Sequence, residues 1–293
     1  MKIAIVSKFG HFECIGFLCE VLKEHTVILY ASNDDQGYVS WFNSMFPNTS
    51  VVICSSLPTD IIAEYDAVIK LTSTDSIIHN PKVISIVHLQ NRNTSRYNIS
   101  LTPFIQGNNI VNFTSVYTVP HVSPCYDKVI SYIGFFLNNW VDSDLIDFIT
   151  TSKHRFNFIV WGDHNYNKLK CIPDVTVLQS VPTTDLAAII QKSKFLLSRK
   201  PPHINYDRFS GVFALSASFK KPIVLDRKSY DIYKLPGIVF EKNYMEIPNS
   251  LNMPDDEYNR LVDEITVFNT GAIRDNKEKI DDLLYKVKNM GSF

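Results

Sequence analysis

The sequence lacks the features that mark several protein classes. Its 293 residues include only five cysteines and no Cys-x-x-Cys spacing, so we expect neither a zinc site nor a disulfide framework, and a reducing compartment fits best. The formal net charge of −1 provides no basic field for nucleic acid or a membrane surface. No apolar run approaches the roughly 18 residues of a membrane helix, and Lys2–Val6 is too short for a signal peptide. We expect a cytoplasmic protein with no membrane span.

Several cofactor and catalytic motifs are also missing. The segment after Val6 has one glycine, Gly10, where a dinucleotide-binding fingerprint needs three, and neither a Walker sequence nor Gly-x-Ser-x-Gly occurs. Asp142-Ser143-Asp144 has the spelling of a metal-binding Asp-x-Asp, but it falls at the start of a predicted helix, so we interpret it as capping. Aromatic residues make up 12% without interleaved basic residues, which favours core packing and sugar stacking over nucleic-acid binding. We therefore expect no cofactor and no metal.

Short apolar runs alternate with segments of helical period along the whole chain. Such alternation predicts βαβ units and parallel sheets. Predicted strands are 3–7, 26–31, 51–54, 67–71, 83–88, 116–119, 129–133, 156–161, 175–178, 195–198, 222–225 and 238–240, with loops and one short strand in 89–113. Predicted helices are 13–23, 38–45, 143–151 capped by Ser143, 185–192 capped by Thr184, 210–219, and two more after residue 255.

The segment Val119–Pro124 reads as a linker, because it has two prolines, few charges and no helical period. The length of the chain also suits two domains. We expect an α/β protein with two Rossmann-like, doubly wound domains, 1–122 and 123–270, that face a cleft. Residues 271–293 are expected to form a C-terminal helix that can pack back on the first domain.

The second half resembles the donor-binding domain of GT-B-fold glycosyltransferases. The resemblance rests on Val129–Gly134, Phe158–Asp163, Val177–Leu186 and Phe209–Val224, which follow one another in the order of that family's elements. It covers residues 114–245 well and the first half only by pattern. The sequence also resembles members encoded by large DNA viruses of algae, which would place it in the host cytoplasm. The resemblance implies an acceptor-binding first domain and a second domain that binds a nucleotide sugar.

The segment Arg199–Val224 is the predicted donor site. A glycine at a helix start lets the backbone approach a ligand, and the exposed N–H groups together with the helix dipole favour an anion. The bland alternative is that its cations are solvated surface charges and that Pro201-Pro202 only stiffens a loop. The predicted donor-binding residues are Arg199, Lys200, His203, Asp207, Arg208, Ser210, Gly211, Val212, Ser216 and, for the base, Leu178.

The chain departs from the family at two positions of this segment. Retaining members often carry two glutamates eight residues apart, where this sequence has Arg208 and Ser216. The usual ligand of the ribose hydroxyls is then missing at Ser216, and Asp207 is one possible substitute. Gly134 is also followed by Phe135-Phe136 rather than by a basic residue.

Catalysis by inversion needs a general base for the acceptor hydroxyl and stabilisation of the departing diphosphate. Gly10-His11 follows the first strand and resembles the Gly-His of inverting GT-B enzymes, and a histidine titrates near neutrality. Asp75 or Glu13 is a second base or orients His11, although both also suit helix capping, as His11 itself does. His88, at the end of a strand, is the predicted acceptor-side residue, or else a satisfied strand-end histidine.

These residues predict an inverting, metal-independent glycosyltransferase. Its donor would be a nucleotide-diphosphate sugar, with a UDP-sugar favoured, and its acceptor a glycan. The alternatives are a retaining transferase with a rearranged site, a non-catalytic GT-B-like protein that binds nucleotide sugars, and, more weakly, a sugar-nucleotide epimerase.

Overall fold

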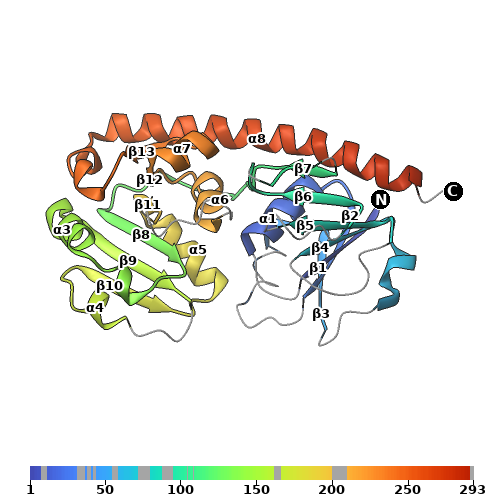
Figure 1. Ribbon diagram of the computed structural model, residues 1–293, viewed down its shortest axis with the longest axis horizontal. Helices are drawn as coiled ribbons and strands as arrows, with labels where there is room; N and C mark the ends of the chain where they lie inside the picture. The colour runs from blue at the N-terminus through green and yellow to red at the C-terminus, as the bar shows by residue number, and fades with distance from the viewer. Residues whose placement is uncertain are drawn as a thin grey trace. The chain divides into compact units, whose positions relative to one another are not determined.

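A computed structural model gives the fold of the chain (Figure 1). It describes residues 1–7, 12–31, 37, 41, 44–54, 59–71, 80–87, 95–103, 105–107, 109–161, 166–199 and 210–290. The chain divides into two compact units, each with its own sheet. Unit 1 contains the described residues among 1–117 and 271–293, and unit 2 those among 118–199 and 210–270. Within the described ranges, no helix is both long and apolar enough to cross a membrane.

Unit 1 is built on a seven-stranded parallel sheet with the strand order β3-β2-β1-β4-β5-β6-β7. The order reverses beside β1, as in doubly wound folds. All strands end at one side of the sheet, which we call its carboxyl edge. The elements are β1 (Lys2–Ser7), α1 (Phe12–Val21), β2 (Thr26–Ala31), β3 (Thr49–Ile53), the 3-10 helix η1 (Thr59–Glu64), β4 (Ala67–Leu71), β5 (Val83–Val87), β6 (Tyr97–Ser100) and β7 (Ile110–Asn112).

The core of unit 1 comes from strands that are buried on both faces. β4 and β5 have no exposed residue, which explains why they read as continuous apolar runs. One face carries a cluster of Ala4, Val68 and Val83. Elsewhere in the unit, α1 packs closely on the chain after β7: a Cβ at Gly16 would lie 2.9 Å from the ring of Tyr117, which has no exposed surface.

Two predictions in unit 1 need correction. Residues 116–119 are not a strand, because the chain leaves the sheet after β7; Thr114 instead bonds through both backbone groups to Asn276 of the C-terminal helix. The segment 89–113 supplies two strands, β6 and the edge strand β7, where one was predicted. Of the helix predicted at 38–45, the described residues Trp41, Ser44 and Met45 are helical.

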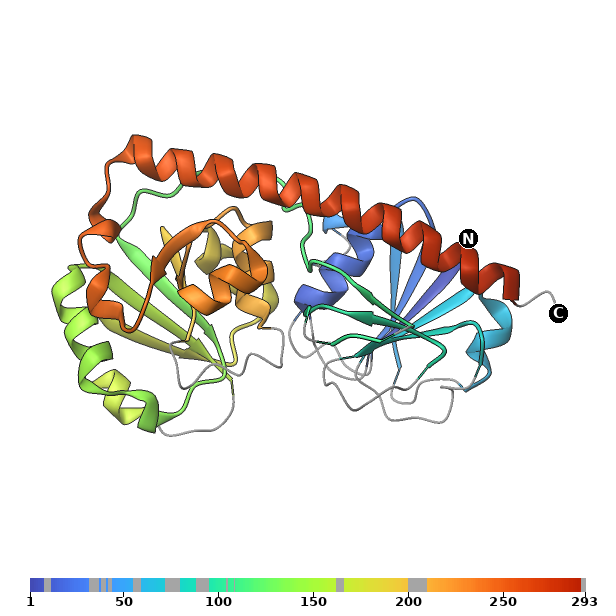
Figure 2. The ribbon, with the colours of Figure 1, turned by 45° about the horizontal axis from the view of Figure 1, so that its top comes forward.

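Unit 2 is a six-stranded parallel sheet with the order β10-β9-β8-β11-β12-β13 (Figures 1 and 2). Its strands and α-helices are β8 (Val129–Gly134), α3 (Ser143–Ser152), β9 (Arg155–Val160), α4 (Asn167–Lys170), β10 (Val175–Gln179), α5 (Thr183–Gln191), β11 (Phe195–Leu197), α6 (Gly211–Ser218), β12 (Ile223–Asp226), α7 (Arg227–Tyr233) and β13 (Gly237–Phe240). Its 3-10 helices are η3 (Asn138–Trp140), η4 (Tyr244–Glu246) and η5 (Ser250–Asn252).

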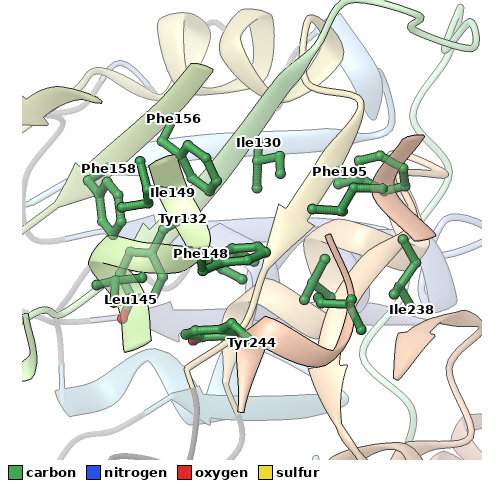
Figure 3. Close-up of a cluster of buried hydrophobic side chains, with 14 of the residues drawn as sticks. Ile130, Tyr132, Leu145, Phe148, Ile149, Phe156, Phe158, Phe195, Ile238 and Tyr244 are labelled. Atoms are coloured by element: carbon green, nitrogen blue, oxygen red, sulfur yellow. The ribbon is translucent and has the colours of Figure 1, made fainter. Parts of the chain in front are cut away.

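An aromatic core fills one face of this sheet. Phe148 of α3 lies against Phe156 of β9, with 5.5 Å between ring centroids, and stacks on Tyr244 at 5.0 Å (Figure 3). Tyr132 of β8 stacks on Phe158 of β9 at 5.6 Å. The strands that carry these rings end at the carboxyl edge, so the core reaches directly to the residues that follow them.

The ends of the helices in unit 2 differ from the prediction. The cap of α3 is Asp142 rather than Ser143, since a carboxylate oxygen of Asp142 accepts from the Leu145 N–H at 3.0 Å. α5 begins at Thr183, so Thr184 lies inside it, and its N-cap position is held by Pro182. The chain after β12 also forms α7, which was not predicted and which Asp226 caps.

The C-terminal segment is one helix, α8 (Asp255–Met290), where two were predicted (Figure 2). Gly271, in its middle, does not break it. In unit 2 the buried Asn269 donates to the Ala217 carbonyl at 2.9 Å. In unit 1 the fully buried Asn276 bonds to both backbone groups of Thr114, and Lys277 pairs with Glu24.

Candidate functional site

The candidate site lies at the carboxyl edge of the unit 2 sheet, where open parallel sheets bind ligands. β9, β8 and β11 are neighbours and end there together. Gly134 is the last residue of β8, the helix η3 with Trp140 follows it, and Arg199 follows β11. This edge therefore combines a glycine turn, an aromatic ring and a cation.

The turn after β8 depends on Gly134. Its φ is +140°, a conformation that residues with a side chain rarely adopt. A Cβ there would have no atom nearer than 3.7 Å, so the backbone conformation rather than lack of space favours glycine. The Tyr132 hydroxyl donates to the Phe135 carbonyl at 2.6 Å and holds the turn. Burial raises the pKa of Tyr132, so this phenol stays a neutral donor.

Arg199 is the cation of the site. It is half-buried, and its guanidinium carbon lies 5.1 Å from the ring centroid of Trp140. Its charge works to lower the pKa of Tyr132, although burial outweighs it. Among the described residues the guanidinium of Arg199 has neither an ion pair nor a hydrogen bond. A partly dehydrated cation without a counter-ion favours the binding of an anion, and the fork of guanidinium donors matches phosphate.

Aromatic rings surround Trp140. Phe135 and Phe136 meet it edge-on, with centroids 5.8 and 5.5 Å away. Phe135 itself is 43% exposed. Beneath these rings lies a cavity of about 20 Å³, which holds about one water molecule. A larger ligand would therefore bind on the exposed side of these residues. The cavity is lined by Tyr132, Phe136, Trp140, Leu145, Phe158, Leu197, Arg199 and Tyr244.

The first turn of α6 is the other feature that suits an anion. Ser210 is its N-cap residue in an extended conformation, and its side chain makes no capping hydrogen bond. α6 follows β11 and precedes the parallel β12, so its first turn lies at the carboxyl edge. Ser210 and Gly211 are partly exposed. The side chain of Val212 is buried, with 4% of the residue exposed, so Val212 can contact a ligand only through its backbone N–H. The N–H groups of a first helical turn and the helix dipole both attract anions.

Two other predicted donor residues have settled positions. Ser216 has no exposed surface, and its hydroxyl donates to the Lys221 carbonyl at 2.6 Å, which fixes the turn after α6. Leu178 is half-buried on the edge strand β10 and pairs in register with Ile159 of β9. The Ser216 side chain therefore stabilises the fold rather than facing a ligand. The backbone of Leu178 lies near the carboxyl end of β10.

The remaining predicted residues cannot be placed. The backbone of Glu13 is in the first turn of α1, but its side chain is outside the description. Outside the described residues altogether are His11, Asp75, His88, Lys200, His203, Asp207 and Arg208.

The interpretation of Asp142-Ser143-Asp144 as capping is confirmed for its first residue. Asp142 caps α3, and a carboxylate oxygen of Asp144 accepts from the Tyr244 N–H at 3.4 Å. In the part of the chain that the structure describes, His, Cys, Asp and Glu side chains form no group of three that would hold a metal ion.

Sequence reasoning missed Tyr132, Phe135 and Trp140. Phe135-Phe136 was noted in the sequence only because no basic residue follows Gly134. The available signal was the density of aromatic residues between Tyr132 and Trp140, directly after a strand and its glycine. Such rings at a strand end can be core or site, and only the position of Arg199 over Trp140 separates the two.

No protein-family model matches this sequence, and comparison with curated proteins finds no match. Solved structures do match. The glycosyltransferase AviGT4, involved in avilamycin A biosynthesis, is 13% identical with a TM-score of 0.69 over 99% of this chain and 98% of its own. Anabaena HepE in complex with UDP-glucose is 11% identical, TM-score 0.65, over 97% and 99%. A variant of phage T4 BGT with UDP-glucose is 11% identical, TM-score 0.55, over 98% and 99%. The chain shares their fold, the GT-B arrangement of two Rossmann-like domains.

Proposed function

We propose that the protein is a glycosyltransferase that moves a sugar from a nucleotide-diphosphate donor, preferably a UDP-sugar, to a glycan acceptor without a metal. The observation that carries this proposal is Arg199, a half-buried cation whose guanidinium has no ion pair and no hydrogen bond among the described residues. It lies at the edge where this fold binds ligands. Two proteins with the same fold have been crystallised with UDP-glucose, which supports a donor of that kind.

The chemistry assigned to unit 2 is the binding of the donor and the stabilisation of its leaving group. Arg199 and Lys200 would neutralise the diphosphate charge that grows as the sugar departs. Backbone N–H groups of Ser210, Gly211 and Val212 would bind the phosphate oxygens. His203, Asp207 and Arg208 belong to the same segment, and Leu178 would support the base through its backbone.

The chemistry assigned to unit 1 is deprotonation of the acceptor. β1, β4 and β5 are neighbours in the sheet and end at the same edge. His11 follows β1 by four residues, Asp75 follows β4 by four, and His88 follows β5 directly. Because these strands deliver the chain to one edge, we propose His11 as the base, with Asp75 or Glu13 as its partner or substitute, and His88 on the acceptor side.

The test is incubation with a panel of UDP- and GDP-sugars, with binding and release of nucleotide as readouts. We expect binding of at least one UDP-sugar and slow hydrolysis of it without an acceptor. Binding of no donor by the folded protein would contradict the proposal. The anomeric configuration of the product separates inversion from retention, since a retained configuration would remove the inverting assignment.

A non-catalytic protein that binds nucleotide sugars is the second candidate. It is favoured by positions 208 and 216, which are not acidic, and by the hydroxyl of Ser216, which bonds to Lys221 inside the fold. The substitution His11→Gln separates the candidates. Loss of turnover with unchanged UDP binding supports the enzyme, while a wild type that binds donors but never turns them over supports the binding protein.

A further inference from the structure

Among the described residues of unit 2, two arginines have guanidinium groups that lie over aromatic rings. Arg227 lies 5.4 Å from the ring centroid of Tyr230 and also pairs with Glu241 at 2.9 Å. Arg199 lies 5.1 Å from the centroid of Trp140, and its guanidinium has no ion pair and no hydrogen bond among the described residues. The first arginine is satisfied within the fold, whereas the second has all five N–H donors available for a ligand.

We infer that Trp140 is a positioning residue, which holds the guanidinium of Arg199 in the plane that meets the donor diphosphate. This inference rests on the proposed function. The ring lies on one side of the guanidinium and makes no hydrogen bond to it, so its N–H groups stay open to two phosphate oxygens. A cation within about 6 Å of a tryptophan centroid is attracted to the ring, more strongly where water is partly excluded.

The ring can do this because it is itself fixed. Phe135 and Phe136 contact it edge-on from the turn after Gly134. The backbone N–H of Trp140 donates to the Leu137 carbonyl at 2.9 Å, which fixes the backbone that carries the ring. The side chain of Asn138 accepts from the Lys168 N–H at 3.2 Å, which ties η3 to α4. A ring held from these directions gives Arg199 a defined orientation before the ligand arrives, so less conformational entropy is lost on binding.

The turn after β8 therefore acts on the ligand through Arg199. Tyr132 closes the turn at the Phe135 carbonyl, Phe135 and Phe136 support Trp140, and Trp140 orients Arg199. This arrangement also gives a role to the aromatic residues that follow Gly134, where the resemblance to GT-B enzymes implies a basic residue. The positive charge comes from the end of β11, and the turn supplies the surface that orients it.

The experiment is a double-mutant cycle on the affinity for UDP and for uridine, with wild type, Trp140→Leu, Arg199→Met and the double variant. We expect Trp140→Leu to weaken UDP about 3- to 30-fold, the range of cation–π energies at about 1.4 kcal/mol per tenfold. Arg199→Met should weaken UDP more, and the double variant should bind no more weakly than Arg199→Met alone. Uridine, which lacks phosphates, should bind all four proteins equally.

Two further variants keep the test decisive. Trp140→Phe retains a ring and should weaken UDP binding less than Trp140→Leu does, which guards against poor folding of Trp140→Leu. Tyr230→Leu removes the other stacked ring and should leave UDP binding unchanged, because Arg227 keeps Glu241.

The outcomes separate the inference from the proposed function. Equal loss of UDP and uridine, or independent effects of Trp140 and Arg199 in the cycle, would overturn the positioning role while donor binding stands. A folded wild type that binds neither UDP nor GDP would overturn the proposed function, and the inference with it.

Discussion

Arg199 and Lys221 are two cations with contrasting surroundings. Arg199 is half-buried, and among the described residues its guanidinium contacts the ring of Trp140 and donates no hydrogen bond. Lys221 is fully buried, and its ammonium donates to the carbonyls of Gln191 at 2.8 Å and Ser123 at 3.1 Å. Lys221 thus binds the end of α5 to the chain that enters unit 2. The first cation suits a ligand from outside, and the second suits the fold.

Replacement of Arg199 by glutamine should weaken UDP binding. Hydrogen bonds to charged groups contribute roughly 1.5–3 kcal/mol, so the dissociation constant should rise about 10- to 150-fold, with little change in thermal stability. Isothermal titration calorimetry checks this. The matched control is Arg155→Gln, since Arg155 is exposed at the start of β9 and should leave UDP binding unchanged. Equal effects of both substitutions would contradict the assignment.

Lys221 should make stability depend on pH. Burial lowers its pKa to about 8, from an ordinary value of 10.5, with a smaller opposing effect of Cys125. Between these values the unfolded chain binds more protons than the folded one, so the free energy of unfolding rises with pH across this window. The gain is at most about 1.4 kcal/mol per pH unit.

The measurement is urea unfolding of wild type and Lys221→Met at pH 7.5, 8.5 and 9.5. The difference, wild type minus variant, should grow with pH, because the variant lacks the titrating amine. The same subtraction cancels the contributions of tyrosines and cysteines that titrate in this pH range, because both proteins contain them. A difference that is flat, or that falls as pH rises, would contradict this account of Lys221.

At the scale of elements, buried strands were the easiest to predict, because both of their faces are apolar. Thr26–Ala31 and Ala67–Leu71 agree with their predicted bounds, and the other strands outside 89–119 agree within two residues. Helix ends were harder to predict, because a capping residue is defined by its hydrogen bond and not by its type alone. Asp142 and Ser143 are both residue types that cap helices well, and only the hydrogen bond from the Leu145 N–H identifies Asp142 as the cap. The prediction at 116–119 failed because an apolar run also suits a buried connection, and here the partner is Asn276, far away in sequence.

The candidate site was predictable in part for the same reason. Arg199 and the start of α6 follow from the pattern of a strand, a loop and a glycine-opened helix. Trp140 did not follow, because nothing local connects it to Arg199, 59 positions later; the neighbouring positions of β8 and β11 bring them together. The C-terminal segment is predicted as two helices because its apolar residues form two separate groups, but packing on both halves maintains one helix through Gly271, although glycine lowers helix propensity.

Two glycines inside helices should respond to alanine with opposite signs. At Gly16 in α1, a Cβ would meet the buried ring of Tyr117 at 2.9 Å, so Gly16→Ala should destabilise unit 1 by about 1–3 kcal/mol. At Gly271 in α8 nothing lies within 4 Å, so Gly271→Ala should stabilise the protein by about 0.5–1 kcal/mol. Chemical denaturation of both variants checks the pair. The same sign for both would refute the packing described for α1.

At the scale of the whole molecule, α8 contributes residues to both units. In unit 1 its Asn276 is fully buried and bonds to the N–H and the carbonyl of Thr114, at 3.1 and 2.6 Å. These two backbone groups lie where the chain has left the sheet, so Asn276 replaces the partners that a strand would supply. The C-terminal segment is therefore part of the fold of unit 1.

Substitution of Asn276 by leucine should destabilise unit 1, because two buried backbone groups would lose their partners. We expect a loss of about 1–3 kcal/mol. Hydrogen exchange at the Thr114 amide should accelerate in the variant, while the strands of unit 2 keep their protection. Asn259→Leu on the same helix is the control, since its contact to Tyr126 is exposed. Unchanged exchange at Thr114 would show that α8 does not hold this segment.

The central claim, a nucleotide-sugar site at the carboxyl edge of unit 2, is tested most directly by a crystal structure with UDP. We predict the diphosphate within hydrogen-bond distance of the Arg199 guanidinium and of the N–H groups at the start of α6, with Arg199 still stacked on Trp140. UDP bound elsewhere, or bound at this edge with its phosphates away from Arg199, would contradict the claim.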